Sequence, residues 1–595
     1  MQQSDTSDAH RGIAFYNNLW AGILVEELRR GGISDFCIAP GSRSAPLAIA
    51  CAENPHIRVH LHFDERGLAY YALGLAKATG KPVAVITTSG TAVPNLLPAV
   101  TEAFLTHAPL ILLTADRPAE LTDSGANQVI RQHEIFASCT IWHITMAEPC
   151  SRIDTRYVAA IAARAADSAR RAALPVHLNC PFAEPLYETP DAAAFERLKE
   201  LADFAGGDRP RANRRGAESA EAEIRLHRDV AEALAGPGII LAGRLESRDE
   251  AVALLEIADH LGWQVLPDAQ SQLRQSGKAL MYADLLLESP GFRNAMEAMP
   301  AALIFSGRFV SRNFLRLAKG REGRKTVMVY PYSDYPDPDF SADMLCQCSC
   351  RDFLRALRKQ IPRRGGAQEA KGDLTCLLNR MVSALVDGFC ENFSEVSVIR
   401  HISRLTGPLM LGNSLPARIF SLAADENSAG LVYSNRGASG IDGVTATAAG
   451  IAAAESHSVT LLTGDTSALH DLNSLALAAS EKLCVLVINN SGGNIFATLP
   501  GAGASNHLER YFALRHSLNF RHAAAMFGLE YHPVSSLEEL DAVYPPREKK
   551  AMLLECEIPW NSTPRLVARL KEAARKLELP ELTGISSASL EHADS

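Results

Sequence analysis

The chain has 595 residues, of which 47% are hydrophobic and 21% charged, and this is the composition of a folded globular protein. Its 59 Lys and Arg against 68 Asp and Glu give a formal net charge of −9, which argues against a general nucleic-acid-binding protein. At about 100–200 residues per domain, the length predicts three to five domains. No apolar run reaches the ~20 residues of a membrane helix, and the polar N-terminus lacks a signal-peptide pattern. We therefore expect a cytoplasmic protein without a membrane span.

Predicted strands and helices alternate through the first third of the chain. Residues 35–40 (DFCIAP), 81–87 (KPVAVIT) and 109–115 (PLILLTA) are short apolar runs of the length of buried strands. Residues 91–107 carry apolar side chains at the spacing of one helical face, which predicts a helix. Near-continuous apolar strands separated by helices indicate a parallel sheet that is covered on both faces.

The middle and the last third of the chain repeat this pattern. Their predicted strands are 238–242, 301–306 and 325–330, then 430–433, 458–463 and 483–489. Residues 189–221 and 363–371 have a linker-like composition, rich in Gly or Ala and in charged side chains. We therefore expect an α/β protein with three doubly wound parallel-sheet domains. The domains would span 12–188, 222–362 and 372–579, followed by a polar tail at 580–595.

Twelve cysteines are scattered along the chain, and none of them forms a CxxC pair, so neither a structural zinc site nor a redox motif is indicated. Cys346, Cys348 and Cys350 are the one cluster. In a strand, alternate residues share a face, so we interpret these three as small buried apolar side chains rather than as metal ligands.

The strongest chemical signal lies at the ends of two predicted strands in the last third. Gly464-Asp465 directly follows one strand, and Asn490, with Gly492 close behind, follows the next. Open α/β sheets bind their ligands at the carboxyl ends of parallel strands. A carboxylate, an amide oxygen and the Gly492 carbonyl form a hard-oxygen set that suits Mg²⁺. Taken alone, Asp465 could equally be a helix cap and Asn490 part of a turn.

This pair of strand ends resembles the thiamine-diphosphate and Mg²⁺ motif of the thiamine-diphosphate enzymes. Where that family usually has Gly-Asp-Gly, Thr466 takes the third position here and leaves the ligand Asp465 in place. The family also needs a glutamate on a separate domain. Glu65 fits, although by itself it is typical of a surface acid beside a helix start. The resemblance implies pyrimidine-binding, central and diphosphate-binding domains in that order.

Further motifs extend the resemblance over almost the whole chain, most densely in the two outer domains. They are 39–44 (APGSRS), 62–67 (HFDERG), 88–91 (TSGT), 115–118 (ADRP), 125–128 (GANQ), 412–414 (GNS), 434–443 (SNRGASGIDG) and 471–473 (DLN). Together they are similar to members of the family that act in menaquinone and phylloquinone biosynthesis. That resemblance implies that 2-oxoglutarate is decarboxylated on the cofactor and that the succinyl carbanion equivalent adds to isochorismate. The alternatives are another thiamine-diphosphate lyase or synthase, such as an acetolactate-type enzyme, and a non-catalytic binding protein of the same fold.

The resemblance also implies roles for individual residues. Glu65 would stabilise the imino form of the cofactor's aminopyrimidine, Gln128 would supply hydrogen bonds at the catalytic site, and Ile441 would support the bent cofactor. The residues expected to contact thiamine diphosphate are Glu65, Ser414, Gly440, Ile441, Gly464, Asp465, Thr466, Ser467, Asn490, Ile495 and Phe496. The ligands expected for Mg²⁺ or Mn²⁺ are Asp465, Asn490 and Gly492.

Both implied substrates are dianions, and four carboxylates call for several guanidinium groups, which bind carboxylates through two hydrogen bonds. The candidate substrate residues are Ser42, Arg43, Arg117, Asn127, Gln128, Arg312, Ser414, Arg418 and Arg436. Most arginines only serve solvation or surface ion pairs, but Arg43 and Arg436 lie in Gly- and Ser-rich loops that suit function better. In the middle domain, Asn313 would replace a second basic residue beside Arg312. A homodimer or a tetramer is implied by the resemblance.

Overall fold

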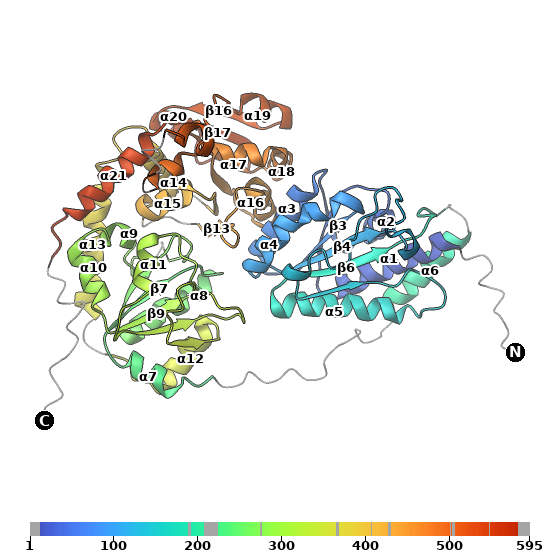
Figure 1. The fold of residues 1–595 in the computed structure, drawn as a ribbon, viewed down its shortest axis with the longest axis horizontal. Coiled ribbons are helices and arrows are strands. Elements are labelled where there is room, and N and C mark those ends of the chain that lie inside the picture. The colour runs from blue at the N-terminus through green and yellow to red at the C-terminus, as the bar shows by residue number, and fades with distance from the viewer. Residues whose placement is uncertain are drawn as a thin grey trace. The chain divides into compact units, whose positions relative to one another are not determined.

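The computed structural model describes residues 12–188, 192–206, 224–273, 276–364, 368–405, 407–425, 430–499, 501, 506–546 and 548–580. The described residues form three parallel sheets flanked by helices, as Figure 1 shows. This confirms the predicted fold class. Most of the predicted tail and residues 207–221 of the first predicted linker lie outside the described residues.

All neighbouring strands in the three sheets are parallel, and each sheet includes neighbours that are not consecutive in the chain. The first has the order β2 (Arg58–Leu61), β1 (Asp35–Ile38), β3 (Val83–Thr87), β4 (Leu110–Asp116), β6 (Val176–Pro181), β5 (Trp142–Thr145). The second has the order β11 (Met344–Cys346), β10 (Lys325–Val329), β9 (Ala301–Phe305), β7 (Gly238–Ala242), β8 (Gln264–Pro267). The third has the order β13 (Val432–Ser434), β12 (Leu409–Leu411), β14 (Thr460–Gly464), β15 (Cys484–Asn489), β17 (Met552–Glu557), β16 (Glu530–Val534). Examples of non-consecutive neighbours are β1 and β3, β7 and β9, and β12 and β14.

The chain divides into two compact units. The first unit comprises residues 1–218, 435–456 and 470–483, and the second comprises 219–434, 457–469 and 484–595. The α-helices of the first unit are α1 (Ile13–Arg30), α2 (Ala45–Glu53), α3 (Glu65–Thr79), α4 (Leu97–Leu105), α5 (Arg156–Ala172), α6 (Ala192–Gly206), α16 (Val444–Ala454) and α18 (Leu475–Ser480). Those of the second are α7 (Arg228–Leu234), α8 (Arg248–Leu261), α9 (Ala283–Leu286), α10 (Pro290–Glu297), α11 (Arg312–Ala318), α12 (Cys350–Gln360), α13 (Gln368–Asp387), α14 (Glu395–Leu405), α15 (Leu415–Ala423), α19 (Arg521–Phe527), α20 (Leu537–Val543) and α21 (Ser562–Arg575). Helix α17 (Asp465–His470) begins in the second unit and ends in the first.

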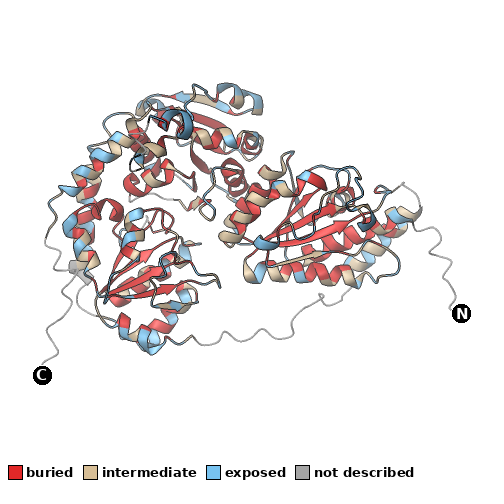
Figure 2. Cartoon of the chain, viewed as in Figure 1, coloured by how far each residue is buried: buried red, intermediate tan, exposed pale blue. Residues whose placement is uncertain are grey.

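The inner strands of the first sheet are buried on both faces, as their apolar sequences predict, whereas the edge strand β2 is mostly exposed and the edge strand β5 is mostly half-buried. In β4, Ile111 and Leu113 belong to one apolar cluster, which includes α1 and α5, whereas Leu110 and Leu112 belong to another, which includes α3 and α4. This alternation follows from the two-residue period of a strand. Figure 1 shows the two sets of helices on opposite sides of these strands, and Figure 2 shows the inner strands as buried.

The helix predicted over 91–107 is wrong in its first part. Two 3₁₀ turns, Gly90–Ala92 and Pro94–Leu96, precede α4, which begins only at Leu97. Proline lacks a backbone N–H and fits only the first turn of a helix. Pro98 would lie inside a helix that began at residue 91, whereas in α4 it takes the second position, where a proline fits.

Both predicted linkers contain residues that are helical in the structure, although their sequences show little apolar periodicity. Helix α6 lies inside 189–221 and packs Leu201 against α1, where a Cβ on Gly22 would come within 2.9 Å of Leu201. The buried guanidinium of Arg197 in α6 pairs with Glu53 at 3.0 Å and with Glu188 at 2.8 Å. A buried arginine looks like a linker charge in the sequence, because its partner Glu53 lies 144 residues away in the chain. Helix α13 likewise begins inside 363–371.

The cysteine cluster is only partly strand. Strand β11 ends at Cys346, and Cys350 begins α12. Cys348 and Cys350 are buried and Cys346 is half-buried, and all twelve cysteines are free. Burial raises the pKa of the Cys348 thiol to about 12. The structure therefore agrees with the interpretation of Cys346, Cys348 and Cys350 as small, at least half-buried side chains. It does not place all three on one face of a strand.

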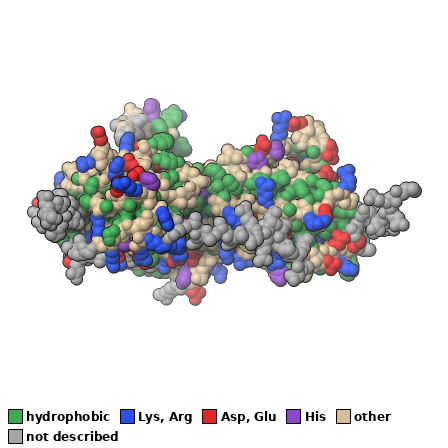
Figure 3. Space-filling model, turned by 90° about the horizontal axis from the view of Figure 1, so that it is seen from below, with side chains coloured by type: hydrophobic (Ala, Val, Ile, Leu, Met, Phe, Trp, Pro, Cys, Tyr) green, Lys and Arg blue, Asp and Glu red, His purple; other side chains and the backbone are tan. Residues whose placement is uncertain are grey.

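Among the described helices, none has both the length and the apolarity needed to cross a membrane. The face drawn in Figure 3 carries basic and acidic side chains mixed with apolar ones.

Candidate active site

Asp465 lies where the sequence predicts it, at the carboxyl end of β14, and it begins α17. Its side chain is 2% exposed. One carboxylate oxygen, Oδ1, accepts hydrogen bonds from Thr466 N at 2.5 Å and Thr466 Oγ1 at 3.1 Å, and Oδ2 accepts one from Gly492 N at 2.9 Å. Gly464 pairs with Ile488 in β15, so the two strands end side by side. Donors from both strand ends therefore orient the buried carboxylate.

Asn490 and Gly492 complete this end of the sheet. Asn490 is buried, and its Oδ1 has no hydrogen-bond partner among the residues that the structure describes. Gly492 has a φ of +131°, and a Cβ there would lie 2.6 Å from Ala513 O, so only glycine fits. Within the described residues, no group of three or more His, Cys, Asp or Glu side chains could hold a metal ion. A cation here would therefore depend on amide and backbone oxygens, and the unpaired Oδ1 next to a carboxylate fits Mg²⁺.

The structure adds Glu395, the first residue of α14, which sequence reasoning missed. Its side chain is fully buried, and within the described part of the chain neither carboxyl oxygen meets the geometry of a hydrogen bond. Burial raises its pKa to about 8, although the side chains of Thr563 and Asn490 nearby act in the opposite direction. An acid at a helix start usually caps the helix in solvent, so no signal in the sequence could have distinguished this one.

His516 is the second residue that the sequence analysis missed. Its Nε2 lies 3.4 Å from Asp465 Oδ2, and its Nδ1 accepts a hydrogen bond from Leu518 N at 3.2 Å. Because Nδ1 is an acceptor, the neutral ring carries its proton on Nε2. Nε2 is buried and forms no hydrogen bond among the described residues, so the imidazole lies beside the carboxylate without bonding to it.

The other predicted cofactor residues of the second unit lie around the same strand ends. A Cβ on Gly464 would meet open space, and Thr466 and Ser467 form the first turn of α17. Ile495 and Phe496 lie in the 3₁₀ turn Asn494–Thr498. At the end of β12, Ser414 has a φ of +73°, and its carbonyl accepts a hydrogen bond from Arg418 Nη1 at 2.8 Å.

Two predicted substrate arginines come together at the carboxyl edge of the first sheet. Arg43 follows β1 and is 7% exposed, and it donates to Phe182 O at 2.9 Å and to Glu184 Oε1 at 2.7 Å. Arg117 follows β4 and donates to Ser89 Oγ and, at 3.0 Å, to Gln128 O. Burial and the nearby Arg43 guanidinium lower the pKa of Arg117. Two cations this close attract an anion.

Neutral polar groups flank this pair of arginines. Gln128 has a φ of +59° and donates from Nε2 to Ser89 O at 2.9 Å. A Cβ on Gly90 would lie 2.6 Å from Gln128 Cγ, so the glycine makes room for the glutamine. Ser42 and Asn127 are exposed on loops of the same edge.

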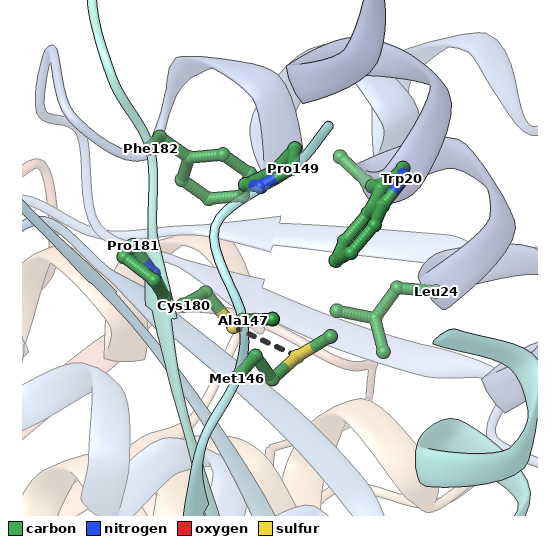
Figure 4. A pocket seen from close by; sticks show the side chains of 9 residues that line it. Trp20, Leu24, Met146, Ala147, Pro149, Cys180, Pro181 and Phe182 are labelled. Atoms are coloured by element: carbon green, nitrogen blue, oxygen red, sulfur yellow. Dashed lines mark hydrogen bonds between the residues drawn. The ribbon is translucent and has the colours of Figure 1, made fainter. Parts of the chain in front are cut away.

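An apolar pocket lies next to the end of β6, where the Phe182 carbonyl accepts a hydrogen bond from Arg43. Figure 4 shows Phe182, Pro181 and Cys180 of this segment facing Trp20 and Leu24 of α1. Figure 4 also shows Met146, whose Sδ accepts a hydrogen bond from Cys180 Sγ at 3.8 Å. The pocket has no charged lining residue. It supports the Phe182 carbonyl that Arg43 binds and offers nothing to hold an ionic ligand.

Glu65 begins α3, after Asp64, whose side chain accepts from the backbone N–H of Arg66 and Gly67 as the helix cap. The Glu65 carboxyl is half-buried and forms no hydrogen bond or ion pair among the described residues. Asp64 therefore does the capping, and Glu65 remains available to a ligand.

The remaining candidates lie in the loop after β13 and in the central sheet. Arg436 and Gly440 are half-buried, and Ile441 is 36% exposed. Arg312 begins α11 with an exposed side chain. Asn313 Nδ2 donates to Asp284 Oδ1 at 3.0 Å and to Glu288 Oε1 at 3.3 Å, and its place beside Arg312 in the site stays a prediction.

Comparison with known proteins agrees with this architecture. The family model for the N-terminal TPP binding domain of thiamine pyrophosphate enzymes matches residues 20–135, and the model for the middle domain of thiamine pyrophosphate enzymes matches 197–409. A protein of Aeromonas salmonicida, named 2-succinyl-5-enolpyruvyl-6-hydroxy-3-cyclohexene-1-carboxylate synthase, is 38% identical over 95% of this chain and 99% of its own. Proteins of the same name from Shewanella loihica and Shewanella oneidensis are each 39% identical over 89% of this chain, and over 92% and 93% of their own. The chain therefore belongs to the 2-succinyl-5-enolpyruvyl-6-hydroxy-3-cyclohexene-1-carboxylate synthase family of thiamine pyrophosphate enzymes.

Proposed function

We propose that the protein is a thiamine-diphosphate-dependent transferase. It decarboxylates 2-oxoglutarate and adds the succinyl carbanion equivalent to isochorismate in a 1,4-addition, and it releases CO₂ and 2-succinyl-5-enolpyruvyl-6-hydroxy-3-cyclohexene-1-carboxylate in menaquinone or phylloquinone biosynthesis. The observation that carries this proposal is the name shared by relatives that align with at least 89% of the chain. The chemical groups for the reaction would come from Asp465 and Asn490 at the ends of β14 and β15, and from Arg43 and Arg117 at the carboxyl edge of the first sheet.

Asp465, Asn490 and the Gly492 carbonyl would hold the Mg²⁺ or Mn²⁺ ion. The support is the buried carboxylate beside an amide oxygen that has no partner. Such a pair is unfavourable without a cation, because a buried acceptor that lacks a hydrogen bond costs about 1–3 kcal/mol. Gly464, Thr466, Ser467, Ile495 and Phe496 would contact the cofactor around this ion.

Thiamine diphosphate, when bound, supplies an acidic thiazolium carbon and an aminopyrimidine that can exchange its proton. Glu65 would hold a proton at the pyrimidine ring nitrogen, which is general acid–base work. Its free, half-buried carboxyl supports that role. Ile441 and Gly440 would contact the bent cofactor, and Ser414 would contact cofactor and substrate.

Arg43 and Arg117 would bind substrate carboxylates, with Gln128, Asn127 and Ser42 as neutral donors. A buried guanidinium needs an anion, and its present partner Glu184 is 72% exposed, so a substrate carboxylate could replace it at little cost. Arg418, Arg436 and Arg312 are the further candidates. A homodimer or tetramer, a cytoplasmic location, the absence of nucleic-acid partners and the domain limits stay predictions.

The test is CO₂ release by the purified protein with thiamine diphosphate and Mg²⁺. We expect turnover of 2-oxoglutarate in the presence of isochorismate, and little turnover of pyruvate, which has one carboxylate fewer for the arginines. Glu65→Gln is the matched control for background decarboxylation. Turnover of pyruvate in preference to 2-oxoglutarate would identify another 2-oxoacid lyase or synthase.

A further inference from the structure

The loop at 435–443 rests on α4 of the same compact unit through one buried carboxylate. Glu102 is 1% exposed, its Oε1 accepts a hydrogen bond from Gly437 N at 2.9 Å, and its Oε2 accepts one from Ala438 N at 2.7 Å. A Cβ on Gly437 would lie 2.8 Å from Leu105 Cβ. The loop backbone therefore approaches the helix so closely that only glycine fits.

Helix α3 holds both ends of the same loop. Near the end of the helix, Lys77 Nζ donates to Asn435 Oδ1 at 2.8 Å and lies 3.4 Å from Glu102 Oε1. Near its middle, Tyr70 OH donates to Asp442 Oδ2 at 2.8 Å. Burial and the Asp442 carboxylate raise the pKa of Tyr70, so the phenol keeps its proton.

The chemistry at the centre of this contact requires a carboxylate. Two backbone N–H groups and one ammonium converge on Glu102, and only an ionised acid offers two oxygens that both accept. A glutamine of the same size would turn its NH₂ toward one of these donors and leave that N–H without a partner. Hydrogen bonds to an ionised acceptor are also about twice as strong as neutral ones.

We propose that Glu102 is a positioning residue that fixes the loop carrying Arg436 and Ile441. Helix α3, which begins with Glu65, also holds this loop through the contacts of Lys77 with Asn435 and of Tyr70 with Asp442. The inference rests on the proposed function, which gives Arg436 and Ile441 their ligands. The competing explanation is that Glu102 only neutralises the buried Lys77.

A comparison of four variants separates the two explanations. Glu102→Gln removes the charge and one acceptor, Lys77→Met removes the ammonium, and the double variant removes both. Glu120→Gln is the matched control, because Glu120 is an exposed acid of the same sheet domain. Glu102→Asp keeps the charge but is one methylene too short, and it replaces Glu102→Gln if that variant fails to fold.

The first readout is amide hydrogen exchange of the peptide covering 435–443, which needs neither cofactor nor turnover. We expect at least tenfold faster exchange at Gly437 and Ala438 in Glu102→Gln, a smaller change in Lys77→Met, and no recovery in the double variant. The proposal is overturned if Lys77→Met speeds exchange as much as Glu102→Gln does and the double variant returns to the exchange rate of the wild type. In that case Glu102 is only the counter-ion of Lys77.

The second readout is the affinity for thiamine diphosphate by calorimetry, together with steady-state kinetics. We expect Glu102→Gln to raise KM for isochorismate and Kd for the cofactor at least tenfold, while Glu120→Gln matches the wild type. Faster exchange with unchanged Kd and KM would show that the loop does not serve the site. If the wild type itself does not turn over 2-oxoglutarate, the proposed function fails, whereas the exchange readout still decides whether Glu102 holds the loop.

Discussion

The buried carboxyl of Glu395 should make the stability of the cofactor-free protein depend on pH. Its pKa rises from 4.5 to about 8 because burial disfavours the charged form. Between these two values the unfolded chain has released the proton and the folded protein keeps it. The free energy of unfolding therefore falls as the pH rises from 4.5 to 8. Each pH unit in this window is worth ~1.4 kcal/mol, so the loss reaches roughly 3 kcal/mol by pH 7.

Glu395→Gln keeps the size of the side chain and removes the titration. We expect the variant to be more stable than the wild type at pH 7, by up to roughly 3 kcal/mol, and to show a flatter pH dependence between 5 and 8. Urea unfolding at several pH values measures both quantities. Glu391→Gln is the matched control, because Glu391 is exposed just before the same helix. Parallel pH profiles for the wild type and Glu395→Gln would mean that Glu395 is ionised in the folded protein, and the reasoning would fail.

Three further predictions concern catalysis. Glu65→Gln should lower turnover by about 10²–10⁴-fold and keep the affinity for thiamine diphosphate; activity within twofold of the wild type would contradict the assignment. Asp465→Ala should weaken thiamine diphosphate binding measured by calorimetry in Mg²⁺ by at least about 10–100-fold, and unchanged binding would leave Asp465 a helix cap. Arg43→Ala should reduce kcat/KM for the substrate it binds by an equivalent of about 2–5 kcal/mol, with partial recovery in Arg43→Lys because an ammonium lacks the planar fork. Loss of cofactor affinity with unchanged kcat/KM would instead assign Arg43 to the diphosphate.

The sequence by itself determined several strands of each sheet and the side chains at their ends, although it did not predict others, such as β2, β6 and β17. Apolar runs of strand length, separated by helices, predict parallel sheets, and β14 and β15 end beside each other as that pattern requires. Asp465 and Asn490 could be placed there because a strand and the turn that follows it are coded by neighbouring residues. One wrong prediction was also local, since Pro98 restricts α4 to a shorter span than its apolar spacing alone predicts.

Only the tertiary structure decided which distant side chains come together. Glu395 and Asn490 are separated in the chain by the helices and strands from α14 to β15. Glu102 accepts a hydrogen bond from Gly437, which lies 335 residues later in the chain. Both glutamates look like ordinary helix acids in the sequence, because helical periodicity and capping patterns reach only about four residues. Their burial follows from how helices pack on sheets. The same long-range pairing made Arg197 in α6 part of a buried ion-pair network, although its surroundings in the sequence are those of a linker.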